Sequence, residues 1–172
     1  MKPYAMGRRV ALGFMGSLSV LVLAGCASFQ DVPPALQGGG HWSGRLALRV
    51  ERTARAQAQS YTAVFDLRGD ADTGELRLST SLGSMLALAR WSPQQAMLDD
   101  GRNGHYFNSV NALIEAATGA AIPIESLFAW LAGQPGAAPG WRADLRQIGQ
   151  GRLHAVRESP APGVDLRIVL DP

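Results

Sequence analysis

Alternation of apolar and polar residues is the feature that most limits the folds open to this chain. Between residues 45 and 51 every second residue is apolar, so Leu46, Leu48 and Val50 share one face of a half-buried strand. The same period of two predicts further strands at 61–67, 75–80, 85–91, 95–99, 152–157 and 164–170. Residues that favour turns separate most of these segments. We therefore predict a long antiparallel sheet.

The period changes to that of a helix in the middle of the chain. Ser109 is a good N-cap for a helix whose apolar residues recur up to residue 117, and Gly119 suits its end. Pro123 fits the first turn of a second amphipathic helix, which Gly133 ends. Two short helices inserted in a long antiparallel sheet predict an α+β fold with the helices on one face. Such a sheet either curls around a packed core or encloses a cavity.

The beginning of the chain is typical of an exported protein. Residues 1–9 carry three basic residues and no acid, and residues 10–25 form an uncharged, mostly apolar run of 16 residues. A helix needs about 20 apolar residues to span a bilayer, so the run favours a secretory signal peptide. It ends in Leu-Ala-Gly before Cys26, which resembles the lipobox of bacterial lipoprotein precursors. That resemblance implies cleavage before Cys26 and attachment of lipid to its thiol.

Cys26 also bears on anchoring and location. The alternative is an uncleaved membrane anchor with a lone buried cysteine, but the only cysteine of the chain stands at the lipobox position. Inner-membrane lipoproteins of enterobacteria typically have Asp directly after the cysteine, whereas Ala27 and Ser28 follow here. We therefore expect an anchor at the periplasmic face of the outer membrane. A covalent diacylglycerol and an N-acyl chain on Cys26 are expected, and no other cofactor.

Composition and length divide the chain into three segments. We predict a signal peptide at 1–25, a lipidated flexible tether rich in Pro and Gly at 26–40, and one domain at 41–172. Three of the 16 basic residues leave with the signal peptide, so 13 remain against 14 acidic residues and the mature net charge is −1. A nucleic-acid-binding protein usually shows a basic excess. We therefore expect no nucleic-acid partner.

Several short strings, spread over the whole predicted domain, resemble the LolB family of outer-membrane lipoprotein receptors. They are Trp42-Ser43-Gly44-Arg45-Leu46, Gly74-Glu75-Leu76-Arg77-Leu78, Ser81-Leu82-Gly83, Thr118-Gly119 with Ile122-Pro123-Ile124, Trp130-Leu131-Ala132-Gly133 and Gly151-Arg152-Leu153. The resemblance implies an unclosed antiparallel β-barrel, or half-barrel, covered by a short helical lid and enclosing an apolar cavity. Such a protein takes triacylated lipoproteins from the periplasmic carrier LolA and inserts them into the outer membrane. The implied partners are LolA, lipoprotein cargo and outer-membrane lipid, and a monomer is expected.

The resemblance also implies two kinds of site residue. In this family a leucine that protrudes from a loop before a strand helps to insert the cargo, and the matching position here is Leu82. The family often has Pro where this chain has Ser81. The expected lining of the acyl-chain cavity is Leu46, Leu48, Phe65, Leu67, Leu76, Leu78, Leu86, Leu88, Ile124, Leu127, Phe128 and Leu131. Periodicity alone favours a packed core formed by the same side chains.

Catalytic and metal sites find little support in the sequence. The three histidines, His41, His105 and His154, are scattered without the spacing of metal ligands. A triad drawn from Ser43, His105 and Asp99 lacks a nucleophile-elbow sequence. We therefore expect a protein that is not an enzyme.

Two other classes of protein remain as alternatives. One is an envelope-sensor lipoprotein that binds lipid or protein on the same half-barrel fold. It would be favoured by an added second domain, which we do not expect after the last predicted strand. The other is a purely structural envelope lipoprotein, which needs no cavity that empties.

Overall fold

The computed structural model describes residues 39–54 and 57–172, and every structural statement below concerns these residues. The predicted signal peptide, Cys26 and all but the last two residues of the predicted tether lie outside them. The strands are β1 (Gly40–Val50), β2 (Gln59–Gly69), β3 (Gly74–Ser79), β4 (Met85–Ser92), β5 (Gln95–Asp99), β6 (Gly104–Phe107), β7 (Trp141–Asp144), β8 (Arg152–Arg157) and β9 (Val164–Leu170). The helices are α1 (Val110–Thr118), α2 (Ile124–Leu131) and the short 3-10 helix η2 (Ile148–Gln150).

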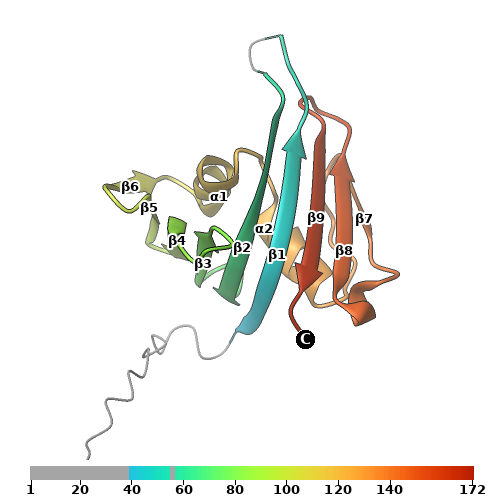
Figure 1. Cartoon of the computed structure of the whole chain (residues 1–172), viewed down its shortest axis with the longest axis horizontal. Helices are drawn as coiled ribbons and strands as arrows, with labels where there is room; N and C mark the ends of the chain where they lie inside the picture. Colours follow the sequence, from blue (N-terminus) through green and yellow to red (C-terminus); the bar gives the residue numbers. More distant parts are fainter. Residues whose placement is uncertain (1–38, 55–56) are drawn as a thin grey trace, which may run out of the picture. The chain divides into compact units, whose positions relative to one another are not determined.

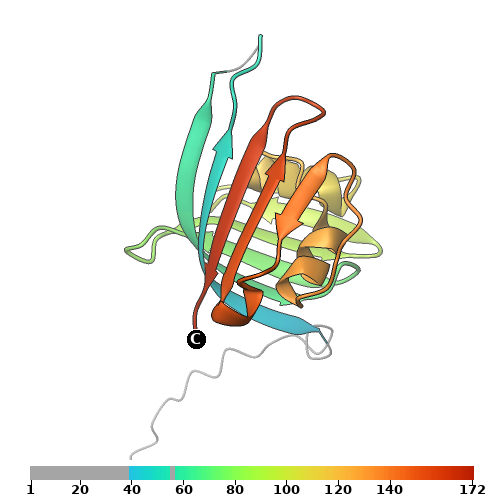
Figure 2. The same cartoon turned by 90° about the vertical axis from the view of Figure 1, so that its right-hand side faces the viewer.

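The strands form one antiparallel sheet in the order β6-β5-β4-β3-β2-β1-β9-β8-β7. The long strand β1 pairs with β2 along its whole length and with β9 from residue 44 onward. Strands β6 and β7 are the two edges, and among the described residues no ladder joins them, so the sheet does not close into a barrel. Its strong twist turns β3–β6 across the direction of β1 and β9 (Figures 1 and 2). The predicted unclosed antiparallel barrel is confirmed.

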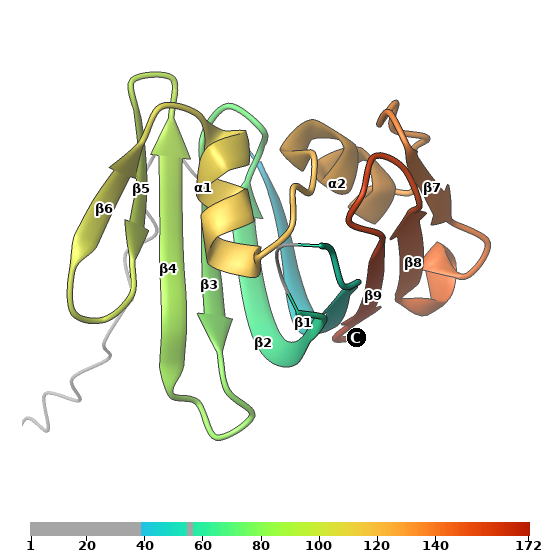
Figure 3. The same ribbon diagram turned by 90° about the horizontal axis from the view of Figure 1, so that it is seen from above.

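The two α-helices lie on the concave face of the sheet (Figure 3). Helix α1 packs against β4, β5 and β6. Its predicted ends are confirmed, since the Ser109 hydroxyl accepts a hydrogen bond from the Ala112 N–H at 3.2 Å and Gly119 adopts a left-handed conformation at its C-terminus. Helix α2 begins at Ile124, and Pro123 occupies the N-cap instead of the first turn. No helix among the described residues is long and apolar enough to cross a membrane.

Apolar side chains on the concave face form one continuous core with the inner sides of the helices. The alternating pattern puts Leu46, Leu48 and Val50 into this core, as the sequence predicts. Trp130 of α2 is among its largest fully buried side chains. All side chains of the core come from residues 42–170, so this part of the chain carries a hydrophobic core of its own.

Strand β4 is the place where the predicted burial pattern is wrong. Ala89 pairs with Leu76 and Ala87 with Leu78, so these two alanines point to the concave side, where α1 packs against β4. Small residues there leave room for the helix. The intervening Leu88 pairs with Arg77 and therefore points to the outer face, outside the core. Leu86 is also outside the core and 45% exposed, so neither leucine lines the concave face.

The sequence did not predict β7 as a strand. It pairs with β8 over residues 141–144, and only Trp141 and Ala143 face the concave side against the core. Two inward residues are too few to make period-two alternation recognisable. The strand forms because β8 offers it a free edge.

Candidate functional site

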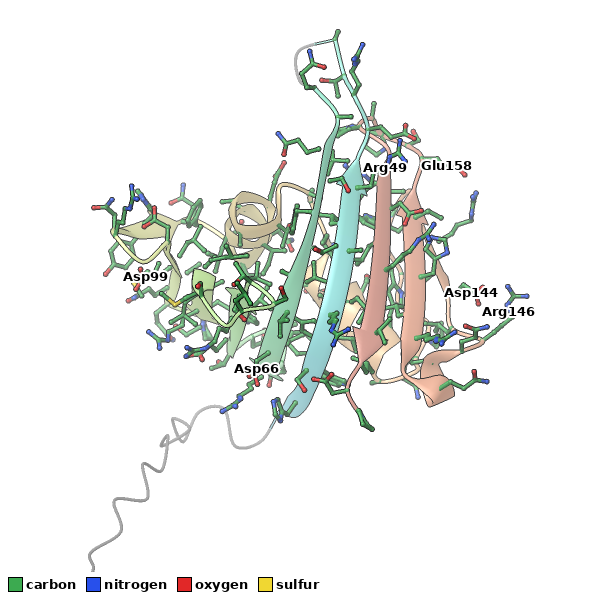
Figure 4. All side chains as sticks on the ribbon, viewed as in Figure 1. Arg49, Asp66, Asp99, Asp144, Arg146 and Glu158 are labelled. Atoms are coloured by element: carbon green, nitrogen blue, oxygen red, sulfur yellow. The ribbon has the colours of Figure 1, made fainter. Side chains whose placement is uncertain are left out.

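The concave face and α2 bring most of the predicted cavity residues together. From the sheet these are Leu46, Leu48, Phe65, Leu67, Leu76 and Leu78, and from the helix Ile124, Leu127 and Leu131. All nine are buried, and they belong to the same core. The labelled charged side chains of Figure 4 instead lie at the ends of strands or outside the sheet. The apolar surface expected for acyl chains is therefore assembled in one place, while an open cavity within it stays a prediction.

Phe128 is the one predicted cavity residue of the concave face and α2 that is only partly buried. It lies on α2, is partly buried, and meets two tryptophans edge-on. Its ring centroid is 5.6 Å from that of Trp42 and 6.3 Å from that of Trp91. Aromatic pairs prefer this perpendicular arrangement because the positive ring edge meets the negative ring face. These three rings, which we call the aromatic cluster, join α2 to the ends of β1 and β4.

A surface hollow of about 470 Å³ opens beside the aromatic cluster. Trp91 and Phe107 lie in its wall, together with Val110 at the start of α1 and the turn at 92–95 between β4 and β5. The turn contributes polar groups to the rim. This hollow is a point at which solvent reaches the margin of the concave face.

Hydrogen bonds from two side chains of the sheet hold the end of α1 and the linker between α1 and α2, and the sequence did not single out either residue. The Tyr61 hydroxyl of β2 donates a short hydrogen bond to the Thr118 carbonyl at the end of α1. Burial is the main cause that raises the pKa of Tyr61 to about 12, against a smaller lowering effect of the Thr118 side chain, so the phenol stays protonated and can donate. The contact joins residues 57 positions apart. Only the tertiary fold reveals it.

Arg157 of β8 fastens the same linker from the other half of the sheet. Its guanidinium donates to the Ala121 carbonyl at 3.4 Å and to the Pro162 carbonyl at 3.1 Å, and lies 5.7 Å from the Trp141 ring centroid. Arg157 is only 8% exposed, and its buried Nε has no hydrogen-bond partner among the described residues. Buried cations usually pair with a carboxylate, whereas this one relies on backbone carbonyls and an aromatic ring.

Leu82, the predicted insertion residue, lies at the tip of the loop between β3 and β4. Its side chain is 93% exposed, the highest value among the large apolar residues described. The Gly83 N–H donates to the Thr80 carbonyl at 2.9 Å, and the Ser84 N–H donates to the Thr80 hydroxyl at 3.1 Å. Gly83 has a φ of +86°, which glycine adopts without strain. The loop is therefore closed by its own hydrogen bonds, with Ser81 where the family often has proline.

The residues of the catalytic alternatives are not brought together. Ser43 on β1 donates to the Asp171 carboxylate at 3.0 Å, whereas Asp99 and His105 lie on β5 and β6, on the far side of the sheet. Neighbouring strands are about 4.8 Å apart, so the five spacings from β1 to β6 exclude a triad. Among the described residues no group of three or more His, Cys, Asp or Glu side chains is placed to hold a metal ion.

Comparison with known proteins shows which protein family this chain is similar to. The family model described as "Outer membrane lipoprotein LolB" matches residues 41–162. The chain is 31% identical to the outer-membrane lipoprotein LolB of Cupriavidus pinatubonensis over 151 residues, which cover 85% of this chain and 70% of that protein. It is 30% identical to the protein of the same name from Aeromonas hydrophila subsp. hydrophila over 131 residues, 69% of this chain and 64% of that one. The chain thus spans less than two thirds of the Aeromonas protein.

Proposed function

The chain belongs to the outer membrane lipoprotein LolB family, and from that premise we propose that it is a receptor for lipoproteins at the outer membrane. It accepts acylated lipoproteins from a periplasmic carrier of the LolA type and inserts them into the membrane. Lipid on Cys26 holds it at the periplasmic face. Its partners are the carrier, the cargo and membrane lipid, and it works as a monomer without chemistry of its own.

The observation that carries this proposal is the exposure of Leu82 on a hydrogen-bonded loop. Moving one leucine side chain from water into lipid gains about 1.5–3 kcal/mol. That gain is too small to anchor a protein, but it is enough to favour contact between the loop and the bilayer at the moment of delivery. Leu82 therefore directs insertion of the cargo, while the lipid on Cys26 provides the anchor.

The apolar concave face provides the binding surface for the acyl chains of the cargo. Burial of acyl chains contributes about 0.8 kcal/mol per CH₂ group. Transfer therefore needs no fuel if the receptor holds the chains more tightly than the carrier, and the membrane more tightly than the receptor. To admit the chains, α2 must move away from Leu48 and the other inward leucines of the sheet. We place the entry at the partly buried Phe128, whose ring meets Trp91 in the wall of the neighbouring hollow.

A transfer assay tests the proposal. Purified mature protein is mixed with a carrier-bound lipoprotein and with liposomes, and cargo is followed from the carrier to the receptor and then to the vesicles. The expected result is movement of cargo at each step without added nucleotide. If cargo never leaves the carrier, the proposal is wrong.

An unanchored form comprising residues 27–172 separates the role of Cys26 from that of the domain. This form keeps the whole apolar core, so we expect it to accept cargo and to retain part of the insertion activity. Without the lipid it has no preference for the membrane in which it is anchored. In a mixture of two vesicle populations, the unanchored form should therefore deliver cargo equally to both. The anchored protein should favour the population in which it is embedded.

A further inference from the structure

The outer face of β4–β6 carries a second group of apolar side chains, separate from the core. Leu88 is only 6% exposed although it points outward and belongs to no part of the core cluster. Met97 on β5 pairs with Arg90 on β4, which is two residues from Leu88, so Met97 also points to the outer face. Tyr106 on β6 pairs with Met97 and therefore faces the same side. We call Leu82, Met85, Leu86, Leu88, Met97 and Tyr106 the outer apolar patch.

A bulge in β4 joins this patch to the Leu82 loop. Ser79 pairs with Met85 whereas Leu78 pairs with Ala87, so two residues of β4, Met85 and Leu86, lie opposite one residue of β3. At such a bulge the two residues opposite a single partner residue can both point to the same face, which here is the outer face of the sheet. They are 39% and 45% exposed, and Tyr106 at the edge strand is 71% exposed. Met85 and Leu86 are thus neighbours of Leu82, whereas Tyr106 lies two strands beyond β4, at the edge of the same face.

Two glycines lie close to the methionines of this face. A Cβ atom added to Gly101 would lie 3.7 Å from the Met85 ε-methyl, and one added to Gly104 would lie 3.7 Å from the Met97 sulfur. Both methionines therefore rest against backbone that has no side chain of its own. Methionine side chains are flexible and adapt to irregular partners, which suits contact with a fluid surface.

The charges around the outer apolar patch are of mixed sign. Glu75 is paired with Arg90 at 2.8 Å and with Arg77 at 3.8 Å. The Asp100 carboxylate accepts hydrogen bonds from the backbone N–H groups of Arg102 and Asn103. The carboxylates near the patch are therefore already engaged. A rim of this kind matches a zwitterionic headgroup layer better than a strongly charged protein surface.

The position of the tether is compatible with a membrane on this face. Gly40 pairs with Gly69, which pairs with Gly74, so β1 begins at the opposite end of β3 from the Leu82 loop. Six residues of β3 extend over about 20 Å, so a domain standing on its tether end would hold Leu82 away from the bilayer. The 13 residue steps from Cys26 to Gly39 reach at most about 45 Å. A domain lying on its outer face brings the loop and the anchor to the same membrane.

We propose that the outer apolar patch lies on the lipid bilayer, with Met85, Leu86 and Tyr106 contacting lipid beside Leu82. The patch and the concave face then have separate tasks on opposite sides of one sheet. The concave face holds the acyl chains, and the outer face sets the distance and orientation at which the loop meets the membrane. This inference rests on the proposed receptor function and adds to it the surface that docks.

Single cysteines carrying an environment-sensitive dye test the docked orientation. The unanchored form, residues 27–172, contains no cysteine because Cys26 is the only one in the chain. The dye is attached to Leu82→Cys, Leu86→Cys, Tyr106→Cys and, as the matched control, Val169→Cys. Val169 is also apolar and 52% exposed but lies on β9, away from the patch. Vesicles of phosphatidylethanolamine and phosphatidylcholine, which are both zwitterionic, should raise the fluorescence at positions 82, 86 and 106 and leave position 169 unchanged.

The outcomes separate this proposal from the receptor function. If position 82 responds while 86 and 106 behave like 169, the outer apolar patch does not dock and the receptor function stands. If position 82 also fails to respond, the proposed membrane contact of the loop is wrong as well. A response of equal size at all four positions would indicate nonspecific adsorption and would overturn the proposal.

Charge substitutions measure the contribution of the patch to binding. Leu86→Glu and Tyr106→Glu should each lower the affinity for these vesicles about three- to tenfold, because each removes part of one apolar side chain from lipid. Val169→Glu should leave the affinity unchanged, and circular dichroism verifies that all three variants fold. Unchanged vesicle binding together with reduced transfer from the carrier would show that a protein covers the patch instead, and would overturn the proposal.

Discussion

Leucine side chains on the two faces of the sheet differ in their exposure to solvent. On the concave face Leu48 is fully buried in the core, and its contribution is to folding. At the edge of the outer face Leu82 is held in water by a hydrogen-bonded loop, where it adds nothing to the core. Residue type is the same, so position alone decides whether the side chain stabilises the fold or is available to a partner. The difference indicates that the outer leucine serves contact with lipid.

The largest expected effect compares these two leucines directly. Leu48→Ala removes a fully buried side chain of β1 from the core and should lower the free energy of unfolding by about 2–5 kcal/mol. Leu82→Ala should change it by less than about 0.5 kcal/mol, since an exposed side chain loses no packing. Urea denaturation of both variants measures the contrast. Equal losses of stability would show that Leu82 packs into the fold and is not free for lipid.

A smaller effect on the free energy of unfolding is expected for the hydrogen bond that holds the end of α1 to the sheet. Tyr61→Phe removes the hydrogen bond to the Thr118 carbonyl and should cost about 0.5–1.5 kcal/mol near neutral pH. Unfolded tyrosine titrates near pH 10, whereas the pKa of buried Tyr61 is raised to about 12. The stability provided by the neutral phenol is therefore complete below about pH 10 and is lost as the pH rises towards about 12.

Urea unfolding at two pH values checks the Tyr61 prediction. Tyr61→Phe has no ionisable group at this position, so the stability gap between it and the unaltered protein should narrow from about pH 8 to about pH 11. Tyr106→Phe is the matched control, because Tyr106 is exposed and its ring faces solvent. A gap that stays constant over this range would mean that Tyr61 ionises as freely in the folded protein as in the unfolded chain.

The smallest effect is expected on the charged outer surface. Side-chain and backbone hydrogen bonds from Arg146 lower the pKa of Asp144 to about 2, and the two side chains are 87% (Arg146) and 40% (Asp144) exposed. Arg146→Gln should return the pKa of Asp144 towards its usual range without a measurable change in the urea midpoint, because water screens exposed ion pairs. A carboxyl NMR titration follows the pKa. A clear loss of stability would show that the outer surface supports the fold more than burial indicates.

Sequence alone predicted the long antiparallel sheet because each long strand alternates clearly between the two faces, whereas the open edge of the sheet was implied by the family resemblance. It failed at β4, where Leu86 and Leu88 are apolar but point outward, while Ala87 and Ala89 point inward. Hydrophobicity says that such residues avoid water, but it does not say which side of the sheet will cover them. That depends on the register with β3 and on the space that α1 leaves.

The candidate site, too, could be predicted from the sequence only in part. Exposure of Leu82 agrees with the prediction from the family resemblance, and its insertion role stays a prediction. Tyr61 and Arg157 were missed, because their partners lie 57 and 36 residues away, at the end of α1 and in the α1–α2 linker. No local pattern marks a side chain that meets a backbone carbonyl so far along the chain. Such contacts follow from the fold and can be found only with it.

The central claim is that Leu82 acts at the membrane and not in cargo binding, and Leu82→Glu tests it most directly. In the transfer assay, receipt of cargo from the carrier and its release into liposomes are timed separately, with Val169→Glu as the control. We predict that receipt keeps its normal rate, and that insertion slows about tenfold or more because the favourable transfer of the leucine into lipid is lost. Equal loss of both steps, or no loss of either, would contradict the account.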